Sequence, residues 1–477
     1  MSKQKIGLFL GPSLFILIRL FFYPEGLEHS ANAILASTAW IAVWWITEAV
    51  QIAVTALLPI ILFPLTGGLS LSETTASYGH KYIFLFIGGF ILAIAIEKWN
   101  LHKRIALTII KLVGTNINRI ILGFMVATAF LSMWISNTAT AVMILPVGIA
   151  IVLQLKDNPL TVENEHQTFG KALMLAIAYS ASIGGMATLI GTPPNLVLAG
   201  VVERTYDTEI TFGQWFMFGF PLSIILLFIS WGYLTRFAFT FKQKTFPGGR
   251  AEIVNQLQKL GKVSYEEKLI LIVFCLTAIA WICRSFLLVK VLPAIDDTII
   301  AIIASVLLFI LPSKQEGRLI VWEDAVKLPW GILILFGGGM ALASGFDSSG
   351  LAVWIGSQLT SFVGISLLLL LLIIITAVNF LTEITSNLAT TAMLLPILVP
   401  VAVVLEVHPY ILLVSATVAA SCAFMLPVAT PPNAVVFGSG YLNMSDMVKK
   451  GIWMNMISIL ILTAFVYFIL PLLWDIQ

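Results

Sequence analysis

The sequence predicts an all-α membrane protein that crosses the bilayer many times, and three observations support this fold class. First, 59% of the 477 residues are hydrophobic and only 10% are charged, whereas soluble domains carry about 25% charged residues. Second, the apolar residues form separate runs of about 20 residues, the length of a membrane-spanning helix. Third, the two halves of the chain repeat the same motifs.

The composition also excludes several classes of protein. A net charge of +2 leaves no strongly basic surface, so we expect no nucleic-acid partner. Long apolar runs are also unlike the alternating strands of an outer-membrane barrel. Cys275, Cys283 and Cys422 all lie within apolar runs, where the expected role is that of a small buried side chain.

About eleven apolar runs are predicted to be transmembrane helices. The first follows Lys3 and Lys5 and superficially resembles a signal peptide, but it is long and lacks a small-residue cleavage site. We therefore expect it to be retained as a membrane span. In chain order the predicted spans are 6–23, 31–47, 51–65, 78–97, 171–202, 212–240, 269–290, 296–312, 330–346, 410–440 and 452–474.

Two further apolar stretches, 118–154 and 365–405, are interrupted in the middle by polar residues. Each is too long for one span and too interrupted for two. We predict re-entrant hairpins, because non-helical backbone within a membrane is tolerated where it is buried or lines a cavity.

The distribution of lysine and arginine supports this layout and fixes its orientation. With the N-terminus in the cytoplasm and the C-terminus outside, most of the 26 basic residues fall on the cytoplasmic side of a cell membrane. Residues 98–115 are predicted to form an amphipathic helix at the interface. The basic residues that fall outside, or within spans, are Arg19, Lys81, Arg204, Arg284 and Lys290.

The chain is therefore expected to divide into four segments. Residues 1–29 hold the N-terminus and first span, and 30–241 form a first repeat with hairpin 118–154 and a broken span at 171–202. Residues 242–268 are a basic cytoplasmic linker. Residues 269–477 form a second repeat with hairpin 365–405 and a broken span at 410–440.

The internal repeat is visible in two motifs. Ser136-Asn137 recurs as Ser386-Asn387, and the segment Thr-Pro-Pro-Asn at 192–195 recurs at 430–433. In the predicted topology the first hairpin enters from the cytoplasm and the second from outside, so the repeats are inverted. Inverted repeats with interrupted helices are typical of secondary transporters, whose sites lie near the membrane midplane.

These motifs offer polar groups without positive charge. Serine, threonine and asparagine supply hydroxyl and amide groups, and proline frees the carbonyls before it while it restarts a helix. No lysine or arginine occurs in either hairpin tip or either Thr-Pro-Pro-Asn segment. Co-bound Na⁺ is the counter-charge that suits such oxygens, since a divalent metal prefers carboxylates. No organic cofactor is expected.

Glu383 is the ionisable residue within the second hairpin, and its counterpart in the first repeat is Met133. Two roles remain open for it: bracing the hairpin, or direct coupling to an ion. No nucleophile–base pair or metalloprotease motif is visible, so we expect no enzymatic activity. A channel is also disfavoured, because no continuous polar run indicates a pore.

The chain resembles the divalent anion/sodium symporter family in four features. They are the Ser136-Asn137-Thr138 motif, its mate at Ser386-Asn387, the paired Thr-Pro-Pro segments and the stretch Trp99–Arg104. This family comprises sodium-coupled di- and tricarboxylate carriers. The resemblance covers nearly the whole chain. It implies a homodimer in the lipid bilayer that works by an elevator mechanism, in which a scaffold domain holds a moving transport domain.

The resemblance also implies the site residues. The first sodium site would use Ser132, Ser136, Asn137 and Gly191. The second would use Thr382, Thr385, Asn387 and Ala429. The carboxylates of the substrate would meet Asn137, Thr138, Asn387, Thr430 and Pro431.

The second signature departs from the symmetric pattern, because Leu388 stands where the first repeat has Thr138. We expect Na⁺-coupled symport of C4-dicarboxylates such as succinate, malate and fumarate. The alternatives left open are sodium-independent exchange of dicarboxylates or citrate, and transport of sulfate or another divalent anion.

Overall fold

The computed structural model describes residues 2–114, 116–157, 164–242, 249–315, 317–358 and 364–476. Within them the chain is almost entirely helical, and one antiparallel pair of two-residue strands, β1 (Pro312–Ser313) and β2 (Gly317–Arg318), joins two helices. Part of the predicted basic linker 242–268, and part of the connection between the predicted hairpin 118–154 and the predicted broken span 171–202, lie outside the described residues.

Among the described residues up to 259, the first half of the chain contains thirteen α-helices and two turns of other helix types. They are α1 (Lys3–Phe21), α2 (His29–Thr47), α3 (Ile52–Thr55), α4 (Leu58–Thr66), α5 (Leu71–Ala76), η1 (Ser77–Gly79), α6 (Lys81–Lys98), α7 (Leu101–Val113), α8 (Ile117–Ser132), α9 (Asn137–Asp157), α10 (Glu165–Gly185), α11 (Pro193–Tyr206), α12 (Phe212–Gly232), η2 (Tyr233–Ala238) and α13 (Gly249–Lys259).

The second half continues the helical chain to residue 474. Its elements are α14 (Tyr265–Cys283), η3 (Arg284–Leu288), α15 (Val289–Val291), α16 (Asp297–Ile310), α17 (Trp322–Ala325), α18 (Trp330–Ser348), α19 (Leu351–Gln358), α20 (Leu367–Thr382), α21 (Asn387–Val404), α22 (Pro409–Ala420), α23 (Pro431–Phe437), α24 (Met444–Phe468) and α25 (Leu470–Trp474).

The structure agrees with a protein that crosses the membrane several times. Among the described residues, eight helical segments are long and apolar enough to span a bilayer, and five shorter apolar helices accompany them. The predicted span 51–65 is divided between α3 and α4, and the spans ending near 240 and 290 close with the π-helical turns η2 and η3. The count of eleven spans stays a prediction.

The helices follow the same order in each half. The series α6 to α12 in the first half corresponds in its bounds to the series α18 to α24 in the second. In each series a long helix and a shorter one precede the two helices of a hairpin, which are followed by a helix in two parts and a further long helix. The inverted orientation of the two series stays a prediction.

Glycines allow some of these helices to approach closely. A Cβ atom on Gly88 of α6 would lie 2.5 Å from the Cβ of Ala301 on α16. A Cβ atom on Gly338 of α18 would lie 2.6 Å from the carbonyl oxygen of Ala56. Gly88 and Gly338, which occupy equivalent positions in the two halves, are therefore helix-packing positions, as is common in membranes.

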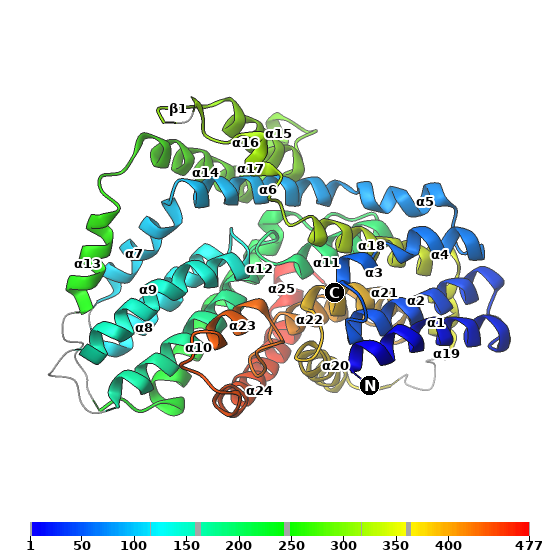
Figure 1. Ribbon diagram of the computed structural model, residues 1–477. Helices are drawn as coiled ribbons and strands as arrows, with labels where there is room; N and C mark the ends of the chain where they lie inside the picture. Colours follow the sequence, from blue (N-terminus) through cyan, green and yellow to red (C-terminus); the bar gives the residue numbers. More distant parts are fainter. Residues whose placement is uncertain are drawn as a thin grey trace.

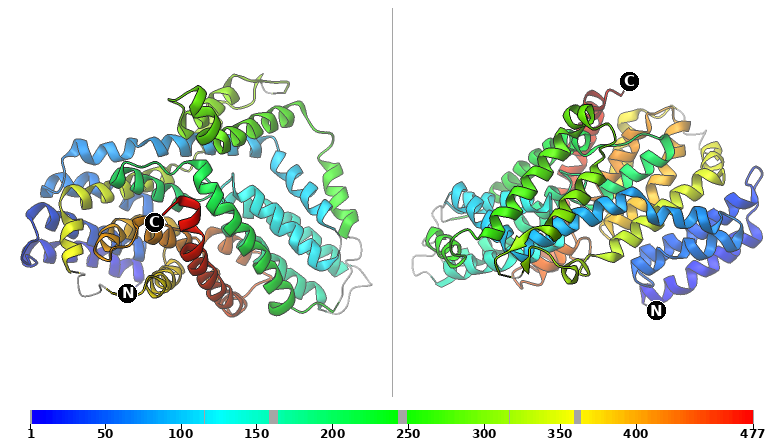
Figure 2. Two further views of the ribbon diagram at one scale, coloured as in Figure 1. Left: turned by 180° about the vertical axis from the view of Figure 1, so that it is seen from behind. Right: turned by 90° about the horizontal axis from the view of Figure 1, so that it is seen from above.

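The helices form two groups around a central region (Figure 1). The N-terminal helices α1 to α4 gather at one end, and α5 and α6 run along one edge beside α14 and α16. The hairpin α8–α9 lies at the other end with α7, α10 and α12, an arrangement also visible from behind and from above (Figure 2). The ends of the hairpins and the breaks in the two interrupted helices meet between these groups.

Candidate functional site

Each predicted hairpin has a short non-helical tip. Helix α8 ends at Ser132 and α9 begins at Asn137, while α20 ends at Thr382 and α21 begins at Asn387. Four residues in each tip interrupt the regular helix, although Ile135 N–H still donates to the Leu131 carbonyl oxygen and Ile384 N–H to the Leu381 carbonyl oxygen. Both tips therefore present polar backbone and side-chain atoms at one point of the fold.

Each predicted broken span is also interrupted in the structure. Helix α10 ends at Gly185 and α11 begins at Pro193, and α22 ends at Ala420 before α23 begins at Pro431. Proline occupies the first position of both α11 and α23, where its missing N–H costs no helical hydrogen bond. The Thr-Pro-Pro-Asn segments therefore mark where each helix restarts.

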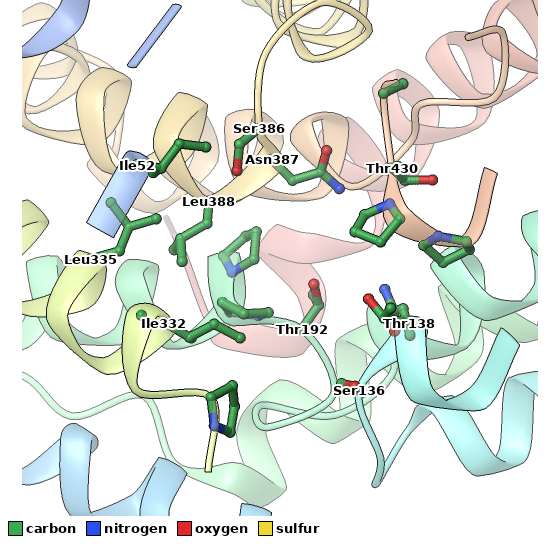
Figure 3. A pocket seen from close by; sticks show the side chains of 18 of the residues that line it. Ile52, Ser136, Thr138, Thr192, Ile332, Leu335, Ser386, Asn387, Leu388 and Thr430 are labelled. Carbon is green, nitrogen blue, oxygen red and sulfur yellow. The ribbon is translucent and has the colours of Figure 1, made fainter. Parts of the chain in front are cut away.

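The two tips and the two breaks surround one cavity of about 710 Å³ (Figure 3). All five residues predicted to meet the substrate line it, and so do five of the eight residues predicted for sodium, two of which, Asn137 and Asn387, belong to both sets. The lining residues from the predicted set are Ser136, Asn137, Thr138, Gly191, Asn387, Ala429, Thr430 and Pro431.

Ser132 and Thr382 lie fully buried just behind the cavity wall. The Ser132 hydroxyl lies within hydrogen-bonding distance of Asn137 Oδ1 and, at 2.7 Å, of the Ala181 carbonyl oxygen. A hydroxyl has one hydrogen to donate, so it can satisfy only one of two acceptors fully. Three oxygens therefore crowd together behind the first tip.

The second tip repeats this arrangement. The Thr382 hydroxyl lies 2.8 Å from Asn387 Oδ1 and 2.9 Å from the carbonyl oxygen of Ala420. Both asparagines thus turn their oxygen toward a buried hydroxyl, and their amide nitrogens are left to face other partners. In Figure 3 the Asn387 side chain extends into the cavity between Ser386 and Thr430.

Thr385 is placed differently from the other predicted sodium residues. Its hydroxyl lies 2.8 Å from the Leu381 carbonyl oxygen and 2.6 Å from the Thr390 hydroxyl, and the side chain is buried within the second hairpin. The structure therefore places Thr385 inside the hairpin, away from the cavity lining.

The cavity has an apolar side. Leu388, Ile332, Leu335 and Ile52 gather opposite Thr138 and Ser136 in Figure 3. These residues come from α21, α18 and α3, so helices outside the hairpins complete the wall. A ligand with polar ends and a short carbon skeleton fits such a divided surface.

The charge of the lining is also distinctive. Among the described residues that line the cavity, no lysine or arginine occurs, and Glu48 carries the one charged side chain. An anion held there would meet neutral donors and helix N-termini instead of a fixed cation.

Residues 3–474 match the family described as the sodium:sulfate symporter transmembrane region. The chain belongs to this family. The membership predicted from the sequence motifs, in the divalent anion/sodium symporters, is thus confirmed, and this family member is a multi-pass membrane protein.

Relatives of this family member cover almost its whole length. It is 50% identical over 475 residues to the sodium-dependent dicarboxylate transporter SdcS of Staphylococcus saprophyticus, covering 98% of this chain and 92% of the relative. It is also 50% identical over 483 residues to the protein of the same name from Staphylococcus aureus, covering 100% of this chain and 93% of the relative. Both relatives are named as transporters.

Two solved structures share the fold. The YdaH transporter of Alcanivorax borkumensis superimposes with a TM-score of 0.61 at 13% identity, covering 94% of this chain and 99% of that one. Neisseria gonorrhoeae MtrF, from a class of antimetabolite efflux pumps, gives a TM-score of 0.56 at 13% identity, covering 96% of both chains. At this identity the likeness concerns the fold alone.

The structure of this symporter-family member also shows residues that hold the site in place and that the sequence analysis did not assign to any function. Asn195 donates its amide hydrogen to the Thr188 carbonyl oxygen at 2.8 Å, and Asn433 donates to the Leu426 carbonyl oxygen at 3.0 Å. Both side chains are fully buried. They hold the non-helical segments before the prolines, and their repeated position in Thr-Pro-Pro-Asn was the signal for this role.

Glu383 provides a further support. Its carboxylate accepts hydrogen bonds from the backbone N–H groups of Phe424, Met425 and Leu426 at 2.8, 3.0 and 3.0 Å, and from Asn455 Nδ2 at 2.7 Å. These contacts join the second hairpin to the break between α22 and α23. The bracing role is the one that these contacts favour.

Two contacts between the first hairpin and the segment around the break after α10 were not predictable from the sequence motifs. The Thr188 hydroxyl donates to the Met133 carbonyl oxygen and so connects the first hairpin to the break after α10. A Cβ atom on Gly185 would lie 2.4 Å from Asn137 Oδ1, so this position has no room for a side chain. Thr188 has no hydroxyl counterpart at Leu426, which is why the repeat gave no signal for it.

Proposed function

We propose that this protein is a secondary active transporter that couples Na⁺ to the movement of C4-dicarboxylates such as succinate, malate or fumarate. The observation that carries the proposal is the pair of oxygen clusters, Ser132 with Asn137 and Thr382 with Asn387, at the two tips around one cavity. The names of the relatives at 50% identity, sodium-dependent dicarboxylate transporters, agree with it.

The tip asparagines give a physical basis for coupling. Each carboxamide oxygen lies beside a buried hydroxyl, where a Na⁺ ion can be held by neutral oxygens. The amide nitrogen of the same group remains available to donate to a carboxylate of the substrate. One side chain thus joins the cation site to the substrate site, and loss of either ligand weakens the other.

The absence of a lysine or arginine from the described cavity lining also favours symport over exchange. A dianion in a site of low dielectric constant needs a compensating charge, and bound Na⁺ supplies it. Two separated carboxylates match two tips better than a compact sulfate ion does. A third carboxylate, as in citrate, would have to face the apolar side that contains Leu388.

The proposal also covers the oligomeric state and the transport mechanism of the protein. We expect a homodimer in which the two hairpins and two interrupted helices form a transport domain that carries substrate across the membrane against a scaffold. The support is that all four of these elements contribute to one cavity. Their common placement allows them to move as one body, as elevator transport requires.

The first experiment is uptake of radiolabelled succinate into proteoliposomes. We expect uptake with an inward Na⁺ gradient and none when choline replaces Na⁺. Uptake in choline that depends on dicarboxylate preloaded inside the liposomes would show that the protein is an exchanger. The assignment of both sodium sites would then be withdrawn. If succinate were taken up in neither condition, succinate would not be the substrate, and citrate, sulfate and other anions would be tested instead.

The site assignment has its own test. Asn137→Ala and Asn387→Ala should each abolish uptake while the protein still folds, whereas Asn255→Ala on α13 should leave uptake unchanged. Ser132→Ala should raise the Na⁺ concentration needed for half-maximal uptake by about tenfold, with a smaller change in the KM for succinate, since it removes about 1.4 kcal/mol of cation binding. Wild-type uptake in both asparagine variants would contradict the assignment.

A further inference from the structure

A second cavity, of about 540 Å³, lies where the end of α12 meets the beginning of α24. Its polar lining includes three basic side chains, Arg236 from η2 and Lys449 and Lys450 from α24. Among the described residues that line it, none is acidic. The cavity is separate from the central cavity, with which it shares no lining residue.

The three positive charges have no carboxylate partner among the described residues. The guanidinium carbon of Arg236 lies 6.0 Å from the ring centroid of Trp231, and Lys450 Nζ lies 5.4 Å from the ring centroid of Phe239. Cation–π contacts of this kind leave the positive charge free to pair with an anion. By contrast, nearby Asp446 is already paired with Lys171 at 2.9 Å.

The rest of the cavity wall is apolar and faces outward. Phe237 is 80% exposed and Trp453 is 62% exposed, which is a large fraction for aromatic side chains. Both rings lie within a few residues of the basic groups in the chain. Basic and aromatic side chains together at the end of membrane helices are typical of the boundary between headgroups and acyl chains.

The backbone keeps this surface in place. The last residues of the predicted span form the π-helix Tyr233–Ala238, a rare form that often marks functional positions. The Tyr233 hydroxyl donates to the Lys450 carbonyl oxygen at 2.9 Å, so η2 and α24 are held together. Arg236 and the lysine pair belong to groups that the charge distribution assigns to the same, cytoplasmic, side.

We propose that this cavity binds an anionic glycerophospholipid of the cytoplasmic leaflet. Its phosphate pairs with Arg236, Lys449 and Lys450, and its acyl chains run along Phe237 and Trp453. Basic cavities between membrane helices on the cytoplasmic side are suited to such headgroups. A free dianion would gain nothing from the exposed aromatic wall, which is why the occupant is a lipid.

The test measures thermal unfolding of the full-length protein in detergent with added lipid. Phosphatidylglycerol should raise the Tm by several degrees, and zwitterionic phosphatidylcholine should not. The triple variant Arg236→Gln, Lys449→Gln, Lys450→Gln should lose most of this shift. The matched control, Lys103→Gln, Lys262→Gln, Lys268→Gln, removes three exposed cytoplasmic charges of the same sign and should keep it.

Further outcomes distinguish the occupant. If the lipid raised the Tm of both triple variants equally, or if both lipids raised the Tm of the wild type equally, the binding would be non-specific and the proposal would be overturned. Protection by glycerol 3-phosphate or inorganic phosphate equal to that by the lipid would overturn it in favour of a small-anion site. Trp453→Ala should weaken protection by the lipid severalfold, and native mass spectrometry should show less phosphatidylglycerol retained by the first triple variant even if its basal Tm differs.

Discussion

Leu388 is the residue at which the two ends of the central cavity differ most. The equivalent position in the first tip is Thr138, which offers a hydroxyl, whereas Leu388 is buried to 6% exposure and joins Ile332 and Leu335 on the apolar side. The second end therefore has one hydrogen-bonding group fewer. This difference gives the site a direction, because a substrate with a single hydroxyl is recognised better at one end.

Leu388→Thr should therefore raise the uptake of malate relative to succinate. One added hydrogen bond contributes about 0.5–1.5 kcal/mol, which corresponds to a change of about 2-fold to 12-fold in the ratio of kcat/KM. Leu388→Val is the matched control, since it removes the same volume without adding a hydroxyl. An equal change in both variants would attribute the preference to size alone.

Glu48 places a negative charge in the lining of the central cavity. It lies at the end of α2 in the left-handed conformation, with φ of 49°, and its carboxylate is the one charge among the described residues lining the cavity. A fixed negative charge opposes the approach of an anion.

Glu48→Gln should lower the KM for a dicarboxylate by about fivefold, because a repulsion of about 1 kcal/mol is removed. The difference from the wild type should shrink when choline chloride raises the ionic strength at constant Na⁺. Glu323→Gln, an exposed carboxylate elsewhere, should leave the KM unchanged. A raised KM in Glu48→Gln would instead give the carboxylate an attractive role, for instance toward Na⁺.

The residues of the site differ in how well the sequence predicted them. Asn137 and Asn387 belong to a repeated motif, and the family resemblance implied Ser132 and Thr382 beside them. The structure places the two pairs in the same relation. Glu48 and Ile332 belong to no repeated motif, and they reach the cavity only through the packing of other helices. Spacing along the chain contains no information about such contacts.

At the scale of elements, the second hairpin depends on a single carboxylate. Glu383 accepts three backbone N–H groups of the segment that follows α22, together with the amide of Asn455. Four donors around one buried group leave little freedom between the hairpin and the interrupted helix.

Glu383→Gln should lower stability by about 3 kcal/mol, because the new amide places a donor among donors and leaves buried N–H groups unpaired. Thermal unfolding and the yield of folded protein measure this effect. Glu48→Gln, with the same chemical change at an exposed position, is the control. A fully stable Glu383→Gln that loses only Na⁺ dependence would favour the coupling role instead.

Helix boundaries were predicted where proline or a polar tip interrupts an apolar run. The breaks before Pro193 and Pro431 were predictable because proline fixes where a helix restarts. The division between α3 and α4 was not predicted, because the run 51–65 remains apolar across it. The membrane environment makes apolar composition compatible with both arrangements.

At the scale of the whole molecule, an ionic cluster connects the two halves of the chain. Lys81 of α6 lies 2.7 Å from Glu203, 3.7 Å from Glu209 and 3.2 Å from Asp296, measured from Nζ to the carboxylate oxygens. Arg284 completes the cluster with contacts to Glu209 at 2.7 Å and to Asp297 at 3.1 Å. Four carboxylates thus share two cations, so the positive charges are in deficit.

This imbalance predicts unequal effects of two neutral substitutions. Lys81→Gln leaves three carboxylates without their common cation and should lower the Tm by several degrees. Glu203→Gln relieves an excess of negative charge and should have little effect. Thermal unfolding at low and high salt measures both, and a larger loss in Glu203→Gln than in Lys81→Gln would contradict the charge count.

The two hairpins described above are fastened by bonds of different strength. A carboxylate holds the second tip, whereas the first has Met133 at the equivalent position and depends on the neutral hydroxyls of Thr188 and Ser132. Charge-assisted hydrogen bonds are roughly twice as strong as neutral ones. We therefore expect the cavity to be more rigid at the second tip than at the first. If Na⁺ binds beside Ser132 as proposed, we expect that ion to be released before the one beside Thr382.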